Sequence, residues 1–337
     1  MLSTLLPIWD RMRTLAALPS ARRMGAWLRV AFVAGILTYL ALRFTEIGWR
    51  EIASSLPTHP LFYLIFLFQY FCLPLTEYTI YRSMWRIPFR SGFPMLLKKR
   101  VYNKDVLGYS GEVYLYTWLK RRMGLRDREA ISTLKDHALV SAATSTAFGG
   151  TVLAALLLSG RLAVFEGFVR SHAASIFAVA VLVGVVALLV ARFRRVLFQL
   201  PARRLGLIAG VHFGRHTVLS VLQVVQWAVV LPGIGIDVWF TFLAMQIVTS
   251  RIPLLPARDA VFLGAGLQLS LAIDVPTAGI ASMLLLATIM DKALNLVLFA
   301  SVSWFGRAGH RKNVPPDAAT PLVGVEGAEE EGVVKAW

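Results

Sequence analysis

Uncharged runs long enough to cross a lipid bilayer alternate with short basic stretches along this chain. Three of these runs cover residues 52–76, 138–160 and 171–191, and they are 25, 23 and 21 residues long. Because an α-helix rises about 1.5 Å per residue, about 20 apolar residues cross a hydrocarbon core of about 30 Å. The pattern therefore predicts an all-α polytopic membrane protein. It disfavours a porin-like barrel, whose strands alternate apolar and polar residues.

We expect about six transmembrane helices and two re-entrant helical hairpins. The expected spans lie within residues 30–42, 60–80, 138–160, 173–191, 205–231 and 275–306. Two further uncharged runs, 238–250 and 260–273, are too short to cross a bilayer and are predicted to form one hairpin. Residues 106–119, in which Glu112 is the one charged residue, are predicted to dip into the membrane from the other side. For residues 275–306, one tilted helix is favoured over two short helices.

The distribution of lysine and arginine predicts the orientation, because positively charged loops stay on the cytoplasmic side. Residues 1–29, 81–136, 192–204 and 307–337 together hold 27 of these cations, whereas the opposite side holds four. Both termini are therefore expected to be cytoplasmic, provided that the 238–273 hairpin enters and leaves through the outer face. We divide the chain into three parts: a basic amphipathic interfacial segment (1–26), a transmembrane domain (27–306) and a disordered cytoplasmic tail (307–337).

The composition supports the membrane class and narrows the chemistry. Of 337 residues, 57% are hydrophobic and 16% are charged, whereas soluble domains average about 45–50% and about 25%. The net charge of +16 comes from short loops between spans, which favours anionic lipid over nucleic acid as a partner. The single cysteine, Cys72, excludes an intrachain disulfide and a cysteine-based zinc site. No phosphate-binding glycine loop or Ser-His-Asp signature is readable, so we predict no catalytic residue, metal or cofactor.

Polar residues recur at helical spacing in the predicted span 205–231. His212, His216, Gln223 and Gln226 share one face, with Arg215 beside it. A charged residue at the centre of a span costs about 2.5–3.5 kcal/mol, so such a face is expected to meet protein or water. Two interpretations stay open: a hydrated groove for a lipid headgroup, or interhelical hydrogen bonds of about 0.6 kcal/mol each. The histidine pair has metal-site spacing, but it lacks the glutamate of a zinc hydrolase motif.

Charged residues also occur in the predicted outer hairpin and in the last span. Asp291 and Lys292 point about 100° apart on a helix, so we expect each to pair with another helix rather than with its neighbour. A structural ion pair and a ligand contact are both open for them. Arg251, Arg258 and Asp259 are expected near one mouth of a central cavity. An arginine fork suits phosphate, and the alternative for both arginines is interfacial snorkelling.

Two short motifs resemble the transmembrane domain of the lysylphosphatidylglycerol synthase family, which includes flippase-like membrane proteins. One runs from Asn103 through Gly111 and Glu112 and is followed by the basic segment 120–125. The other is the proline-rich turn 250–256, followed by a helix that contains Gly264. The family's turn is usually glycine-rich and followed by a glutamate, whereas this chain has Pro-Ala-Arg-Asp at 256–259, with Asp259 in place of the glutamate.

The resemblance implies a multi-pass protein of the bacterial inner membrane that moves a lipid between leaflets. The expected function is a flippase-like translocase or lipid-binding transporter for an anionic or modified phospholipid or glycolipid headgroup. The family's soluble aminoacyltransferase domain is absent, so no aminoacylation is expected. Residues expected to line the central polar cavity are Asn103, Gly111, Glu112, His212, Arg215, His216, Gln223, Arg251, Arg258, Asp259, Asp291 and Lys292. Glu77 is expected at the membrane interface instead.

Two alternatives come from other functional classes. An integral-membrane transferase with a polyprenyl-phosphate sugar donor would use Glu46 and Glu51 in the first outer loop, although such enzymes normally have longer outer loops. A non-catalytic partner would anchor a separate cytoplasmic lipid-modifying enzyme through residues 81–136. Anionic phospholipids are the expected partners in the membrane, and a homo-oligomer is compatible with the sequence.

Overall fold

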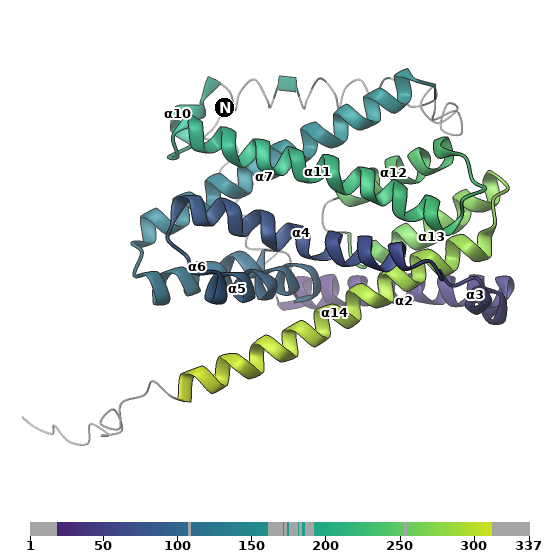
Figure 1. The fold of residues 1–337 in the computed structure, drawn as a ribbon, viewed down its shortest axis with the longest axis horizontal. Coiled ribbons are helices and arrows are strands. Elements are labelled where there is room, and N and C mark those ends of the chain that lie inside the picture. Colours follow the sequence, from purple (N-terminus) through teal and green to yellow (C-terminus); the bar gives the residue numbers. More distant parts are fainter. Residues whose placement is uncertain are drawn as a thin grey trace, which may run out of the picture.

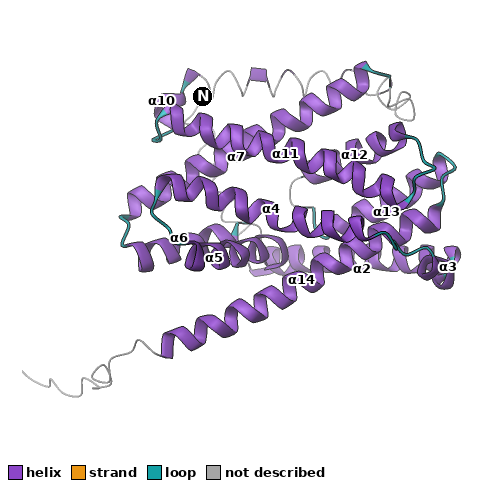
Figure 2. Cartoon of the chain, in the orientation of Figure 1, coloured by secondary structure: helices purple, strands orange, loops and turns teal. Residues whose placement is uncertain are grey.

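A computed structural model describes residues 19–106, 109–160, 192–252 and 255–311, with isolated positions between 171 and 185. Within this part of the chain the elements are helical, and short loops and turns join them (Figure 2). In chain order the elements are α2 (Pro19–Ile47), α3 (Trp49–Ser54), α4 (Pro60–Met84), α5 (Phe89–Val101), the π-helical turn η1 (Tyr102–Val106), α6 (Ser110–Met123), α7 (Asp127–Leu158), α10 (Arg194–Leu197), α11 (Ala202–Val230), α12 (Ile236–Arg251), α13 (Arg258–Ala272) and α14 (Thr277–Arg311).

Five of the described helices are long and apolar enough to cross a membrane. The segments that meet this criterion are Val30–Ile47, Pro60–Met84, Asp127–Leu158, Ala202–Val230 and Thr277–Ser301. They correspond to five of the six spans expected from the sequence, and the remaining expected span, 173–191, lies largely outside the described residues. The all-α membrane class is therefore confirmed.

Prolines define where several helices begin. Pro60 is the first residue of α4, and Pro88 and Pro201 directly precede α5 and α11. Proline has no N–H to leave unpaired at a helix start, and its fixed φ suits the first turn. Pro276 in the same way precedes α14.

Two short helix pairs enter the bundle of long helices from opposite ends (Figure 1). The α5–α6 pair lies at the end where α10 lies, and the α12–α13 pair lies at the end where α3 lies. α11 packs against α4 and α7, while α14 contacts both α13 and α5. The tips of the two pairs therefore meet in the middle of the molecule, next to α14.

Apolar side chains form separate clusters at the two ends of the bundle. The larger cluster joins α11, α12, α13 and α14 around Trp227, Trp239 and Phe242. A second cluster joins α4, α5 and α6 around Tyr81, Leu96 and Leu115.

Helix boundaries differ from expectation at both ends of the described chain. The last apolar stretch is one unbroken helix, as favoured, but α14 continues to Arg311 instead of ending at residue 306. No proline interrupts the chain before Pro315, so the helix can extend into the predicted tail. At the other end, α2 already begins at Pro19, so residues 19–26 continue into the first span. The rest of the predicted interfacial segment and tail, 1–18 and 312–337, lies outside the described residues.

Candidate functional site

Both central helix pairs have a strained residue at the tip. Tyr109 directly precedes α6 with φ 68°, and Ala257 directly precedes α13 with φ 50°. The left-handed conformation costs a residue with a side chain about 1–2 kcal/mol, and such strain concentrates at functional positions. The two tips thus hold the chain in turns that local preferences alone would not select.

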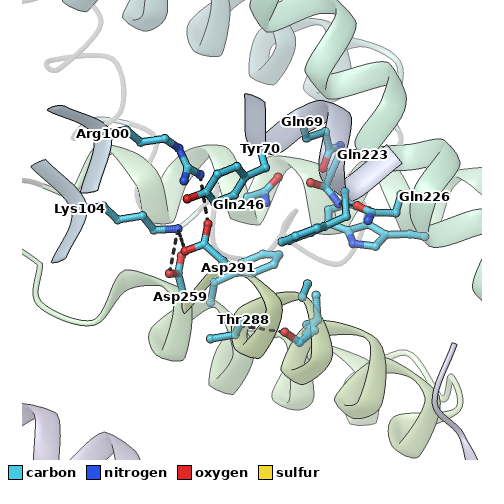
Figure 3. A pocket seen from close by; sticks show the side chains of 15 residues that line it. Gln69, Tyr70, Arg100, Lys104, Gln223, Gln226, Gln246, Asp259, Thr288 and Asp291 are labelled. Atoms are coloured by element: carbon cyan, nitrogen blue, oxygen red, sulfur yellow. Dashed lines mark hydrogen bonds and ion pairs between the residues drawn. The ribbon is translucent and has the colours of Figure 1, made fainter. Parts of the chain in front are cut away.

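An ion-pair network joins the two tips to α14. Lys104 of η1 places Nζ 2.7 Å from a carboxylate oxygen of Asp291 and 3.3 Å from one of Asp259, which lies in the first turn of α13. Arg100 at the end of α5 places Nη2 3.1 Å from Asp291. Figure 3 shows Lys104 between the two carboxylates. We call these four residues the tip network, which contains two cations and two anions.

Asn295 and Tyr70 hold the tip network in position. Asn295 donates to Asp291 from one turn further along α14, over 3.2 Å. Its side-chain oxygen accepts hydrogen bonds from Arg100 at 3.0 Å and from the Tyr70 hydroxyl at 2.5 Å. The Arg100 guanidinium also lies 3.7 Å from the centre of the Tyr70 ring, a cation–π contact. Asp291 is therefore fixed by contacts from three different elements.

A cavity of about 240 Å³ lies beside the tip network. Four glutamines line it from three helices: Gln69 on α4, Gln223 and Gln226 on α11, and Gln246 on α12. Figure 3 shows the charged side chains at one end of the cavity and the amides of α4 and α11 at the other, with Gln246 between them. Trp227 also lines the cavity. A partly open cavity lined by charges, amides and apolar side chains therefore lies where the two tips meet.

A second buried charge cluster lies within the α5–α6 pair. Lys99, whose side chain is 2% exposed, places Nζ 2.6 Å from Glu77 of α4 and 3.4 Å from Glu112 of α6. Asn103 donates to Glu112 over 3.1 Å. Lys99 therefore joins α5 to α4 and α6.

Gly111 lets α5 and α6 approach closely enough to form this cluster. Its N–H donates to Asn103 over 2.7 Å. A Cβ atom at this position would lie against the carbonyl oxygen of Lys99 and 2.7 Å from Asn103 Oδ1. Both contacts are shorter than real Cβ contacts, so no residue larger than glycine fits without moving the pair apart.

Gly111→Ala is expected to lower the free energy of unfolding by about 1–3 kcal/mol, because the added methyl group forces the α5–α6 pair open. Chemical denaturation in mixed micelles measures this. Gly214→Ala on α11 is the matched control, since nothing lies within 4 Å of the added carbon. It is expected to be neutral or to stabilise by up to about 1 kcal/mol through helix propensity. Equal losses in the two variants would contradict the close approach.

A histidine pair links α7 and α11 away from the cavity. His212 and His137 face each other with Nε2 atoms 3.2 Å apart, and His137 Nδ1 lies 3.2 Å from the Tyr81 hydroxyl. Further along α11, Arg215 lies 3.1 Å from the His216 ring. The polar face of α11 is therefore divided. In its first part, His212 contacts α7 and Arg215 contacts its neighbour His216, whereas Gln223 and Gln226 in its second part line the cavity.

The predicted site residues fall into three groups plus a remainder. Gln223, Asp259 and Asp291 line the cavity. The cluster around Lys99 brings together Asn103, Gly111 and Glu112, and His212, Arg215 and His216 lie along α11. Arg258 and Lys292 are exposed and do not line the cavity. The side chain of Arg251 lies outside the described part.

Glu77, expected at the membrane interface, is buried and accepts a hydrogen bond from Lys99. Its depth in the membrane stays a prediction. A carboxylate near the end of a span reaches headgroups only if no cation comes to it from within the bundle, and α5 brings one.

Several cavity residues were missed from the sequence. Arg100 and Lys104 belong to a basic run that is typical of a cytoplasmic loop, yet α5 and η1 carry them to the centre. Gln69 and Gln246 each stand alone among apolar neighbours in their helices and gave no periodic signal. An isolated amide inside an uncharged run is the one feature that could have marked them.

The glutamates of the transferase alternative do not converge on one site. Glu46 accepts a hydrogen bond from Arg43 over 2.6 Å. Glu51 lines a different cavity, between α3 and the start of α14.

Comparison with known proteins leaves the family open, since no protein-family model, curated protein or solved structure matches the chain. Function is therefore argued from the geometry.

Proposed function

We propose that this protein binds the polar headgroup of a membrane lipid in the central cavity and moves it between the two leaflets. The observation that carries the proposal is the meeting of two helix pairs, from opposite ends of the bundle, at a chamber lined by charges and amides. In the proposal both pairs are re-entrant, and their tips lie near the bilayer midplane.

The depth of Asp291 supports this placement. It is the fifteenth residue of the 25-residue apolar segment Thr277–Ser301, and its side chain is 10% exposed. Backbone that is not a spanning helix is tolerated at such depth only where protein buries it or water reaches it. Paired broken helices around a midplane site are a recurring transporter arrangement.

The tip network supplies a candidate moving part. Lys104 and Asp259 are about one-third exposed and join one tip to the other across 3.3 Å. A headgroup bound in the cavity lies beside this contact, and separation of Lys104 from Asp259 would move one pair away from the other. We choose a lipid as the ligand because of the sequence resemblance. A lipid also suits the geometry, since its acyl chains can stay in the bilayer while its headgroup enters the cavity.

The test is translocation of short-chain fluorescent lipids in proteoliposomes, read by chemical quenching of the outer leaflet. We expect the protein to speed translocation over empty vesicles for at least one headgroup. Lys104→Met is expected to slow translocation at least about tenfold, because it removes the contact between the tips, leaves Asp259 without its cation and leaves Asp291 with Arg100 alone.

Lys120→Met is the matched control. Lys120 forms an exposed pair with Asp127 at 2.9 Å and lies outside the cavity, so translocation should stay within about twofold of the unaltered protein. The proposal would be refuted if folded protein translocated neither phospholipids nor glycolipids faster than empty vesicles do.

A further inference from the structure

The cavity wall leaves uncharged hydrogen-bonding groups, rather than charges, for a ligand. From this we infer that the headgroup is uncharged and rich in hydroxyl groups, as in a glycolipid whose sugar is attached directly to diacylglycerol. This inference rests on the proposed function and names the ligand class of the same cavity.

The charges in the wall already satisfy one another. Arg100 and Lys104 both contact Asp291, and Lys104 also contacts Asp259. A phosphate that took Lys104 would leave Asp259 without a cation, and one that took Arg100 would leave Asp291 with Lys104 alone. An ammonium group that took Asp291 would leave Arg100 without an anion. Breaking one partner out of a buried pair is strongly unfavourable. A ligand without net charge avoids this cost.

The uncommitted hydrogen-bonding capacity of the wall lies in its amides. The side-chain N atom of Gln69 is buried and makes no hydrogen bond within the described residues. Gln223 donates to Gln226, which in turn donates to the Phe62 carbonyl, so the side-chain oxygen of Gln223 stays available. Both a donor and an acceptor therefore await a ligand. A hydroxyl group can serve both, whereas the phosphodiester of a phospholipid only accepts.

The size and the apolar part of the wall fit one sugar ring. The cavity of about 240 Å³ is smaller than the roughly 300–1,000 Å³ of pockets that enclose drug-sized ligands, so acyl chains stay outside. Trp227 and Phe262, whose ring centres are 6.3 Å apart, supply apolar surface in the same wall. The C–H face of a sugar ring can pack there while its hydroxyls reach the amides.

Photo-crosslinking tests the ligand class directly. The full protein is placed in phosphatidylcholine nanodiscs doped with a diazirine-bearing probe, either glucosyl-diacylglycerol or phosphatidylglycerol with the same acyl chains. Mass spectrometry then maps the labelled peptides. We expect the glucosyl probe to label the peptides that contain Gln246 and Thr288 at least about tenfold more than the phosphatidylglycerol probe.

Amide variants connect the preference to the wall. Gln246→Leu is expected to reduce glucosyl labelling by up to about tenfold, the equivalent of one hydrogen bond. Gln199→Leu is the matched control, because Gln199 is exposed and outside the cavity, and it should leave labelling unchanged. The comparison of the two probes on the unaltered protein stands even if a variant folds poorly.

The outcomes separate this inference from the proposed function. Stronger cavity labelling by phosphatidylglycerol would overturn the uncharged headgroup while leaving a lipid in the chamber. Labelling of the cavity by neither probe above the phosphatidylcholine background would remove the proposed function and the inference together.

Discussion

Lys99→Met is expected to lower the free energy of unfolding by about 3–5 kcal/mol. The substitution removes the ammonium that lies 2.6 Å from Glu77 and 3.4 Å from Glu112 and leaves both carboxylates without their cation inside the bundle. Removing one partner of a buried ion pair is costly because the remaining charge stays desolvated. Chemical denaturation in mixed micelles measures the loss.

Two further variants show whether the loss comes from uncompensated charge. The triple variant Lys99→Met, Glu77→Gln, Glu112→Gln has no charge left in the cluster and should regain most of the lost stability. Lys120→Met breaks a pair of similar length whose side chains are about half exposed, so its cost should stay below about 1 kcal/mol. A Lys99→Met loss as small as that of Lys120→Met would show that the buried pair does not hold α5 in place.

Asp291→Asn is expected to release the tips of the two helix pairs. The amide keeps the shape of Asp291 but removes the negative charge that Arg100 and Lys104 share, so Arg100 loses its carboxylate and Lys104 keeps Asp259 alone. We expect the substitution to lower the free energy of local opening at the tips by about 3 kcal/mol, which makes amide hydrogen exchange there about 100-fold faster. Hydrogen–deuterium exchange of residues 102–106 and 258–262 provides the measurement.

Asp237→Asn is the control for this release. Asp237 is exposed in the first turn of α12, at the end of that helix away from the tip. Its loss should leave the exchange of the same segments unchanged. If the Asp291 and Asp237 variants exchanged alike, the tip network would not be what keeps the two pairs together.

The lengths of the uncharged runs predicted most of the helices, but they did not predict that basic residues lie inside the bundle. The spans and the short pair α12–α13 are visible as uncharged runs, because crossing a bilayer demands them. The three consecutive cations Lys-Lys-Arg at 98–100 are unfavourable inside a membrane, so the sequence predicts them in a cytoplasmic loop. Two of these three residues are instead neutralised by carboxylates of α4 and α14. Partners so distant in sequence leave no local mark.

The candidate site was predicted in part for a related reason. Asp259 was expected in the cavity from the resemblance, in which it stands in place of a glutamate. Asp291 and Gln223 were expected there because polar residues in apolar helices are expensive. The same argument selected His212 and Lys292, which have other surroundings. The free-energy cost of a polar group in an apolar helix implies that the group has a partner or binds a ligand. Which of the two applies depends on the fold. His212 finds a partner in His137, whereas Gln69 has none within the described residues.

The charge balance of the tip network has a consequence for energetics across an energised membrane. Moving one uncompensated elementary charge across a membrane potential of 100 mV requires or releases about 2.3 kcal/mol of electrical work. Arg100, Lys104, Asp259 and Asp291 sum to zero, so a rearrangement that carries them together does no electrical work. With an uncharged cargo, such a cycle would run at the same rate in a polarised cell as in a depolarised one.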